Sequence, residues 1–102
     1  MVLNTYQENI NIISAIQDAW KYRFKNEFPL SFIQEIHIST DLLNIPNNNV
    51  GVAVDTSVVY FDEMEPDRYV NSKIYAIVFN YFHRQFASRI DCYSITIYLK
   101  DN

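Results

Sequence analysis

Residues 73–86 read KIYAIVFNYFHRQF, and the conformation of this stretch decides the fold. The nine positions from Ile74 to Phe82 hold eight apolar residues and one amide, Asn80. No Gly or Pro interrupts residues 67–88, and that length exceeds the length of an ordinary strand. We therefore predict a helix over 67–88, although its β-branched and aromatic residues would also suit a buried strand.

On such a helix the apolar residues fall into two stripes. One stripe consists of Val70, Ile74, Ile77 and Tyr81, and the other of Tyr75, Phe79, Phe82 and Phe86. A helix that lies on a sheet needs only one apolar stripe. The second stripe either packs against an earlier helix through Trp20 and Phe24, or stays partly exposed and meets another chain. Both interpretations fit the spacing.

The rest of the chain supplies one more helix and several strands. Apolar residues recur at steps of three and four over residues 5–28, which predicts an amphipathic helix that begins at a Thr5/Glu8 capping box and ends at Pro29. The segment 31–40 alternates as a strand with one wet side, and 41–49 reads as a loop with a short helical turn. Residues 50–61 form either one long strand or two strands joined at 55–57. The alternation over 90–100 predicts a last strand with Tyr93 inward and Cys92 outward.

These elements predict a small α+β domain over residues 1–102, in the order α-β-β(β)-α-β. Two helices would pack on one face of a three- to four-stranded antiparallel or mixed sheet. The hydrophobic fraction of 49% and the sixteen Trp, Tyr and Phe residues are enough to build a dense core in a chain of 102 residues.

Composition also excludes several classes of function. Gly51 is the single glycine, so the glycine-rich phosphate-binding motifs are ruled out. The formal net charge is −4, which disfavours direct binding to nucleic acid and to acidic partners and allows a basic partner. Cys92 is the single cysteine, so no disulfide can form within the chain. The N-terminal residues lack the pattern of a secretory signal. The longest apolar run is far shorter than the ~20 residues of a membrane span. We expect a cytoplasmic protein, and the richness in Asn, Ile and Tyr is typical of bacteria and phages with A/T-rich genomes.

No residue pattern predicts catalysis, a cofactor or a metal. His37 and His83 lie in no ligand-spaced motif, and Cys92 has no base beside it in the sequence. Asp55 would share a face with small residues if it lay in one long strand, but the triplet 55–57 also suits a turn, which we prefer. We therefore expect a protein that is not an enzyme.

The most distinctive polar segment is FDEMEPD at residues 61–67, which has four carboxylates in six positions. It lacks the alternation and the glycine of a calcium loop, so we interpret it as an acidic surface near a helix N-terminus. The sequence thus predicts a small acidic, non-catalytic protein-binding module, such as an inhibitor, an antagonist or an immunity-type protein, that occupies a basic protein surface. The predicted partner-binding residues are Asp62, Glu63, Glu65, Asp67, Tyr69 and Tyr75.

The alternative is a structural assembly subunit, either a homo-oligomer or a component of a phage particle. In that case the second apolar stripe would be the seam between copies. The predicted seam residues are Tyr75, Phe79, Phe82 and Phe86.

Overall fold

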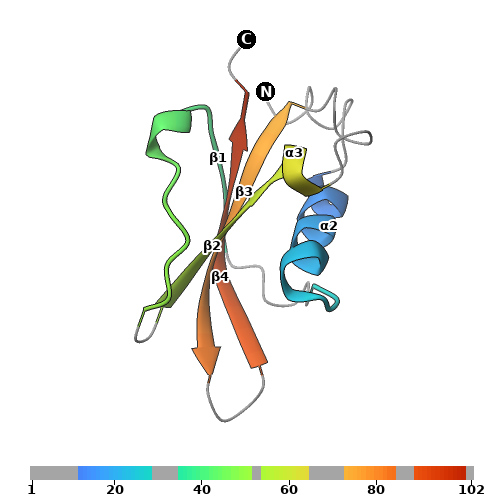
Figure 1. The fold of residues 1–102 in the computed structure, drawn as a ribbon, viewed down its shortest axis with the longest axis vertical. Coiled ribbons are helices and arrows are strands. Elements are labelled where there is room, and N and C mark those ends of the chain that lie inside the picture. Colours follow the sequence, from blue (N-terminus) through green and yellow to red (C-terminus); the bar gives the residue numbers. More distant parts are fainter. Residues whose placement is uncertain (1–11, 29–34, 52–53, 65–72, 85–88, 101–102) are drawn as a thin grey trace.

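The apolar run forms one of the two inner strands of a four-stranded sheet. In the computed structural model, which describes residues 12–28, 35–51, 54–64, 73–84 and 89–100, strand β3 spans Ile74–Arg84. The other elements are α2 (Ile12–Phe24), β1 (Glu35–Ser39), the 3₁₀ turn η2 (Leu42–Asn44), β2 (Val54–Tyr60), α3 (Phe61–Met64) and β4 (Arg89–Leu99). Figure 1 shows the twisted sheet with α2 alongside it.

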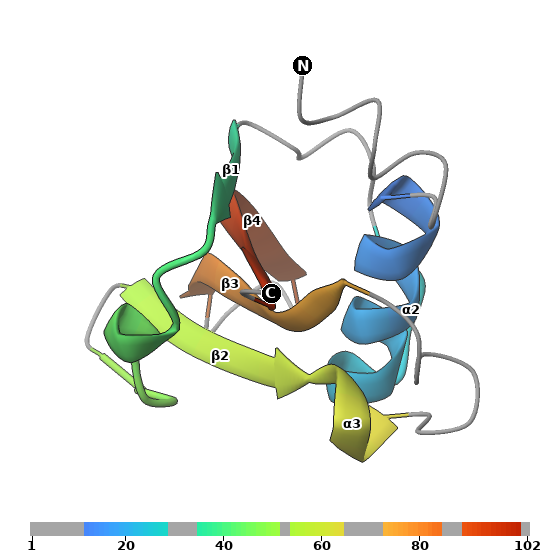
Figure 2. The same ribbon diagram turned by 90° about the horizontal axis from the view of Figure 1, so that it is seen from above.

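The sheet is mixed and has the strand order β1-β4-β3-β2. β1 runs parallel to β4, whereas β2 and β4 both pair antiparallel with β3. Two helices, α2 and α3, lie on the same face of this sheet, as Figure 2 shows from above. The predicted α+β class, the mixed sheet and the two helices on one face are therefore confirmed.

The predicted helix over 67–88 is wrong where the structure describes it, because residues 74–84 are extended. β3 is flanked by strands on both sides, and side chains from both of its faces pack into apolar clusters, so six of the nine residues from Ile74 to Phe82 are buried. A strand buried on both faces loses the polar/apolar alternation that identifies a strand in sequence, and it then resembles a buried helix. The second helix of the fold is instead α3, a single turn between β2 and β3. Residues 67–72 and 85–88 of the predicted helix lie outside the described residues.

Helix α2 packs its apolar stripe on the first face of the sheet around Trp20, which is 1% exposed. The ring centroid of Trp20 lies 4.2 Å from that of Phe24 and 5.1 Å from that of Phe79 on β3. The helix ends earlier than predicted, because Lys25 adopts a left-handed conformation with φ of 61° and donates its N–H to the Lys21 carbonyl at 2.8 Å. Pro29 and the predicted Thr5/Glu8 cap lie outside the described residues.

The second face of the sheet is covered over part of its area by the segment around η2, which is the short helical turn predicted in 41–49. Leu42 and Ile45 of this segment pack on a small apolar cluster. The buried members of the cluster are Val58, Ala76, Val78 and Tyr98. In Figure 2 the sheet separates this segment from α2. The long apolar run is thus explained, since one set of its side chains meets α2 and the other meets the η2 segment.

Two irregularities in the pairing of β3 with β4 change which side chains point inward. β3 has one extra residue at Tyr75, and β4 has one extra residue at Tyr93. An extra residue shifts the alternation by one position. Cys92 is therefore buried in the core beneath α2, and Tyr93 contacts Phe82 with ring centroids 5.0 Å apart. The prediction of Tyr93 inward and Cys92 outward was wrong for this reason.

The segment 50–61 contains one strand, and Asp55 lies inside it. The chain reverses before the strand, because Asn49 and Thr56 form an antiparallel bridge with both N···O distances at 2.9 Å. The preferred turn at 55–57 is therefore wrong. In the part of the chain that the structure describes, no helix is long and apolar enough to cross a membrane.

Candidate functional site

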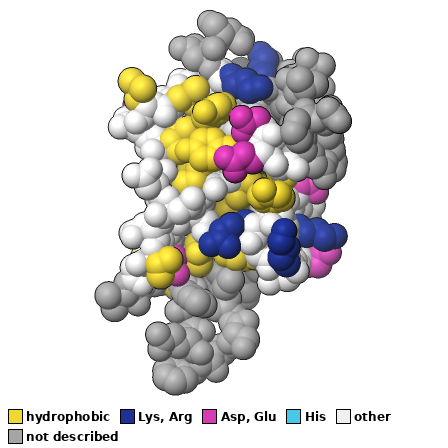
Figure 3. Space-filling model, viewed as in Figure 1, with side chains coloured by type: hydrophobic (Ala, Val, Ile, Leu, Met, Phe, Trp, Pro, Cys, Tyr) yellow, Lys and Arg dark blue, Asp and Glu magenta, His cyan; other side chains and the backbone are white. Residues whose placement is uncertain are grey.

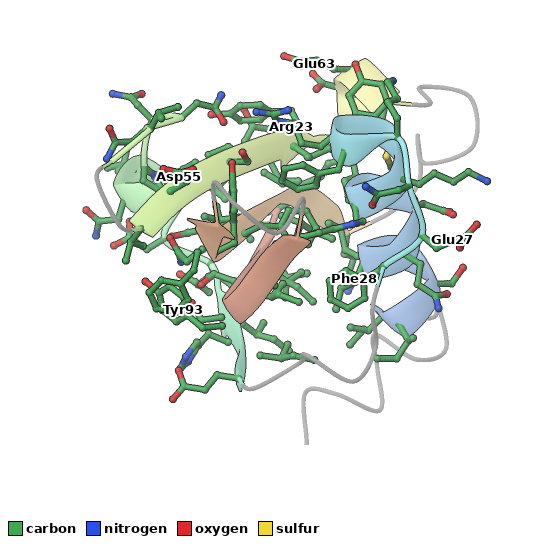
Figure 4. The ribbon with its side chains drawn as sticks, turned by 90° about the horizontal axis from the view of Figure 1, so that it is seen from below. Arg23, Glu27, Phe28, Asp55, Glu63 and Tyr93 are labelled. Carbon is green, nitrogen blue, oxygen red and sulfur yellow. The ribbon has the colours of Figure 1, made fainter. Side chains whose placement is uncertain are left out.

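Two of the four acidic residues that the sequence singled out, Asp62 and Glu63, lie on helix α3, which follows β2 without a break. Phe61 is 1% exposed and packs with Met64 in the core beneath α2. Because a single helical turn directs these two residues inward, Asp62 and Glu63 between them point to solvent. Glu63 is labelled on α3 in Figure 4. The two carboxylates are thus presented by a turn whose other side is fixed in the core.

Two tyrosines lie close to α3 on the second face of the sheet. Tyr60 is the last residue of β2, and Tyr75 is the extra residue of β3, so both side chains face the η2 segment and are half-buried. Their rings meet edge to face with centroids 5.6 Å apart. Figure 3, in the view of Figure 1, shows acidic side chains beside a patch of hydrophobic side chains. We call Tyr60, Asp62, Glu63 and Tyr75 the α3 surface.

The structure brings together only part of the predicted partner site. Asp62 and Glu63 are exposed neighbours in the chain, and Tyr75 is half-buried against the ring of Tyr60, which lies two residues before Asp62. Glu65, Asp67 and Tyr69 lie outside the described residues. Tyr60 was not singled out from the sequence, because its position becomes significant only once β2 is known to end immediately before α3.

The predicted seam does not form a continuous stripe. Tyr75 and Phe79 lie on opposite faces of the sheet, and Phe79 is 0% exposed against Trp20. Phe82 is 38% exposed and contacts Tyr93, whereas Phe86 lies outside the described residues. Of the two alternatives for the second stripe, packing against Trp20 and Phe24 is observed at Phe79, but a strand makes this contact and not a helix.

Cys92 is unsuited to nucleophilic chemistry. Its side chain is 2% exposed beneath α2, and burial raises the pKa of the thiol to about 12. The S–H group donates to the Ser94 carbonyl at 3.6 Å. Since the thiolate is the reactive form, a thiol with this pKa stays protonated and inert at neutral pH.

In the described portion of the chain, His37 is not part of a metal site. His37 is exposed on β1, and its Nε2 lies 2.9 Å from Oε2 of Glu35 on the same face. His83 contributes backbone to β3 opposite Ile90. Among the residues that the structure describes, no three His, Cys, Asp or Glu side chains lie close enough together to hold a metal ion.

Two polar clusters lie on opposite faces of the sheet. The sequence analysis did not find the second, and for Asp55 in the first it preferred a turn over a position within the strand. On the core side, Asp55 is 3% exposed and accepts the Gly51 N–H at 2.8 Å, which ties the preceding turn to β2. On the other side, the Asn80 amide joins three strands, because it accepts from the Thr56 hydroxyl at 2.9 Å and donates to the Ser94 hydroxyl at 3.1 Å. Figure 4 shows Asp55 on β2, and Tyr93 on the side of the sheet away from α2. Asn80, the one amide in the apolar run, was the available signal for the second cluster.

Comparisons of the chain with protein-family models, with curated proteins and with solved structures find no match. A functional argument for this protein therefore depends on its own surfaces.

Proposed function

We propose that this chain is a small acidic, non-catalytic protein-binding module, of the inhibitor, antagonist or immunity type, that docks on a basic protein surface. The observation that carries the proposal is the pair of exposed carboxylates, Asp62 and Glu63, on a turn anchored in the core beside the Tyr60–Tyr75 pair. Charges accelerate encounter with an oppositely charged surface, and tyrosines supply amphipathic contact area. The α3 surface combines the two.

Two further observations support this reading. The net charge of −4 has the sign that a basic partner requires. The tyrosine pair is held against an apolar cluster, so its rings lose little conformational freedom on binding. Preorganised aromatic anchors next to exposed charges are typical of interfaces that bind quickly and specifically.

The test is a capture experiment with a matched pair of variants. In Asp62→Asn/Glu63→Gln, the α3 surface loses two charges. In the control, Glu27→Gln/Asp41→Asn, two exposed carboxylates elsewhere are removed, so both variants have the same net charge. Each tagged protein is incubated, at low and at moderate salt, with a soluble extract of a bacterium that has an A/T-rich genome. The captured proteins are identified by mass spectrometry.

We expect wild type and control to retain the same basic protein, and the α3 variant to lose it. With that protein purified, the association rate of the α3 variant should fall about tenfold at low salt, and its dependence on ionic strength should flatten. Equal capture by the two double variants would exclude the α3 surface. A partner with an acidic binding face would exclude the electrostatic mechanism.

The alternative function, a structural assembly subunit, no longer has its helical seam. Its remaining support is an edge of the sheet, which is a different surface from α3 and leads to a separate inference.

A further inference from the structure

The two edge strands of the sheet differ in how their outer sides are covered. At the β2 edge, the N–H and C=O of Thr56 both bond to Asn49, and the Val58 N–H donates to Oδ1 of Asn48 at 2.7 Å. At the β1 edge, no strand in the described part of the chain pairs with the outer side of Glu35–Ser39. Uncovered edge strands present backbone donors and acceptors that can pair with another strand. The β1 edge is therefore the better candidate for strand addition.

The side chains of β1 are arranged so that the strand can pair with itself. Ile36 and Ile38 face α2, in register with Ile95 and Ile97 of β4, and Ile36 keeps 38% of its surface exposed. Glu35 and His37 lie on the opposite face and already contact each other at 2.9 Å. The strand thus has an apolar face and a face with one acidic and one basic group.

We propose that a second copy of this chain binds at β1, antiparallel, with a twofold axis through His37. This register pairs all five residues of the strand, whereas a shift in either direction leaves some of them unpaired. Ile36 then lies opposite Ile38 of the partner subunit, and Glu35 lies opposite Ser39 of the partner subunit. The two copies form one continuous sheet of eight strands with both α2 helices on the same face.

Three features favour a second copy over an unrelated extended chain. First, the pairing is closed by its own symmetry, so it ends at a dimer and does not propagate. Second, the exposed part of Ile36 is covered by an isoleucine that is also present in the neighbouring copy. Third, Glu35 of each copy lies diagonally across from His37 of the partner subunit, within reach of a long side chain, so the pattern of hydrogen-bonding side chains is complementary to itself.

The first test measures the mass of the intact protein by sedimentation equilibrium between about 1 and 100 µM, a range that covers moderate affinities. We expect a mass twice that of the 12.1 kDa chain at the upper concentrations. Ile36→Lys should weaken the dimer about tenfold or more, as truncation of a buried interface residue does. Ile13→Lys is the control, because Ile13 lies on α2 and is 40% exposed, close to the exposure of Ile36. A monomer across the whole range, or equal effects of the two substitutions, would overturn the proposal.

The second test examines the register and does not depend on the folding of Ile36→Lys. His37 is exposed, and in the proposed dimer the two copies of position 37 face each other across the axis, at a separation that a disulfide can span with a small adjustment. Two copies of position 35 would instead lie roughly 13 Å apart along the strands, at ~3.3 Å per residue. His37→Cys should therefore form a disulfide-linked dimer under mild oxidation, whereas Glu35→Cys should not.

The native thiol does not interfere with this assay, since Cys92 is buried and protonated. Linkage at both positions at equal rates would indicate random collision, and no linkage at position 37 would exclude the His37-centred dimer. The α3 variant Asp62→Asn/Glu63→Gln should dimerise like wild type, so the outcome here is separate from that of the proposed function.

Discussion

Substitution of Phe79 by alanine tests the assignment of residues 74–84 as a strand buried on both faces. Phe79 is 0% exposed, and its ring centroid lies 5.1 Å from Trp20 and 6.3 Å from Phe28. Complete burial of a phenylalanine removes roughly 200 Å² from water, which at about 25 cal/mol per Å² corresponds to about 5 kcal/mol as an upper value. Measured Phe→Ala substitutions in cores cost about 3–5 kcal/mol. We therefore expect a loss of about 4 kcal/mol in the free energy of unfolding.

Phe82 is the matched comparison, three residues along the same strand. It is 38% exposed, and its described aromatic contact is with Tyr93. Only part of its area is transferred from water, and solvent can fill the space that alanine leaves, so the cavity cost is small. We expect Phe82→Ala to cost about 1–2 kcal/mol, on the low side of core truncations.

The assay is equilibrium urea unfolding, followed by circular dichroism and by the fluorescence of Trp20. With a slope of about 1.5 kcal/mol per M, Phe79→Ala should lower the midpoint by about 2–3 M and Phe82→Ala by about 1 M. Since small domains have only about 5–15 kcal/mol of stability, Phe79→Leu provides a milder variant if the alanine protein does not fold. A helix over 67–88 would place both side chains on one stripe. Equal losses at the two positions would therefore refute the strand assignment.

Three further predictions concern single positions. Gly51→Ala should lower the melting temperature measured by calorimetry, because a Cβ at this position would collide with the backbone carbonyl oxygen of Val54. The backbone would have to shift, at a cost of about 1–3 kcal/mol. An unchanged melting temperature would contradict the observed turn. Lys25→Gly should raise the free energy of unfolding, measured in urea, by up to about 1 kcal/mol, because glycine adopts the φ of 61° without strain. A lower free energy of unfolding would show that contacts of the lysine side chain outweigh the backbone strain. Burial raises the pKa of the Cys92 thiol from 9.0 to about 12. As pH rises, the unfolded state therefore loses the thiol proton before the folded state does. The free energy of unfolding should be unaffected by this group below pH 9 and should fall between pH 9 and 12. Cys92→Ala should remove that part of the pH dependence, and rapid labelling of the native thiol at pH 8 would contradict its burial.

Part of the fold follows from the sequence because local patterns there agree with tertiary packing. The stripe around Trp20 predicted α2, and the alternation of Glu35 and His37 with isoleucines predicted a strand with one polar face. In both elements one face meets the core and the other meets solvent. Period and polarity then carry the same information as the structure.

The helix predicted for the apolar run was wrong for a physical reason. The position of β3 between two strands, with α2 on one face and the η2 segment on the other, is set by contacts with residues far away in the chain. The C-terminal end of α2 and the orientation of Cys92 were missed for a different, local reason. A left-handed Lys25 and an extra residue at Tyr93 are local backbone features with no distinctive residue type to mark them.

The candidate site was foreseen in its charges but not in its geometry. Acidic residues after a strand could be read directly from 61–67, and Asp62 and Glu63 are indeed exposed. Their neighbour Tyr60 and the bulge that turns Tyr75 onto the second face depend on the register of β3. Register is a property of paired strands, and a single sequence specifies it weakly where both faces are apolar.

The two proposed surfaces lie at opposite edges of the sheet, and this arrangement makes their combination testable. β1 is one edge strand, and α3 follows β2, the other edge strand, so three interstrand spacings of about 4.8 Å separate the two edges. A dimer joined through β1 would leave both α3 surfaces free at the far ends of the eight-stranded sheet. Such a dimer would bind two partner molecules, and sedimentation of the complex should give a stoichiometry of two to two. If the chain bound its partner through β1 instead, partner binding would dissociate the dimer. The complex would then contain one copy of each chain.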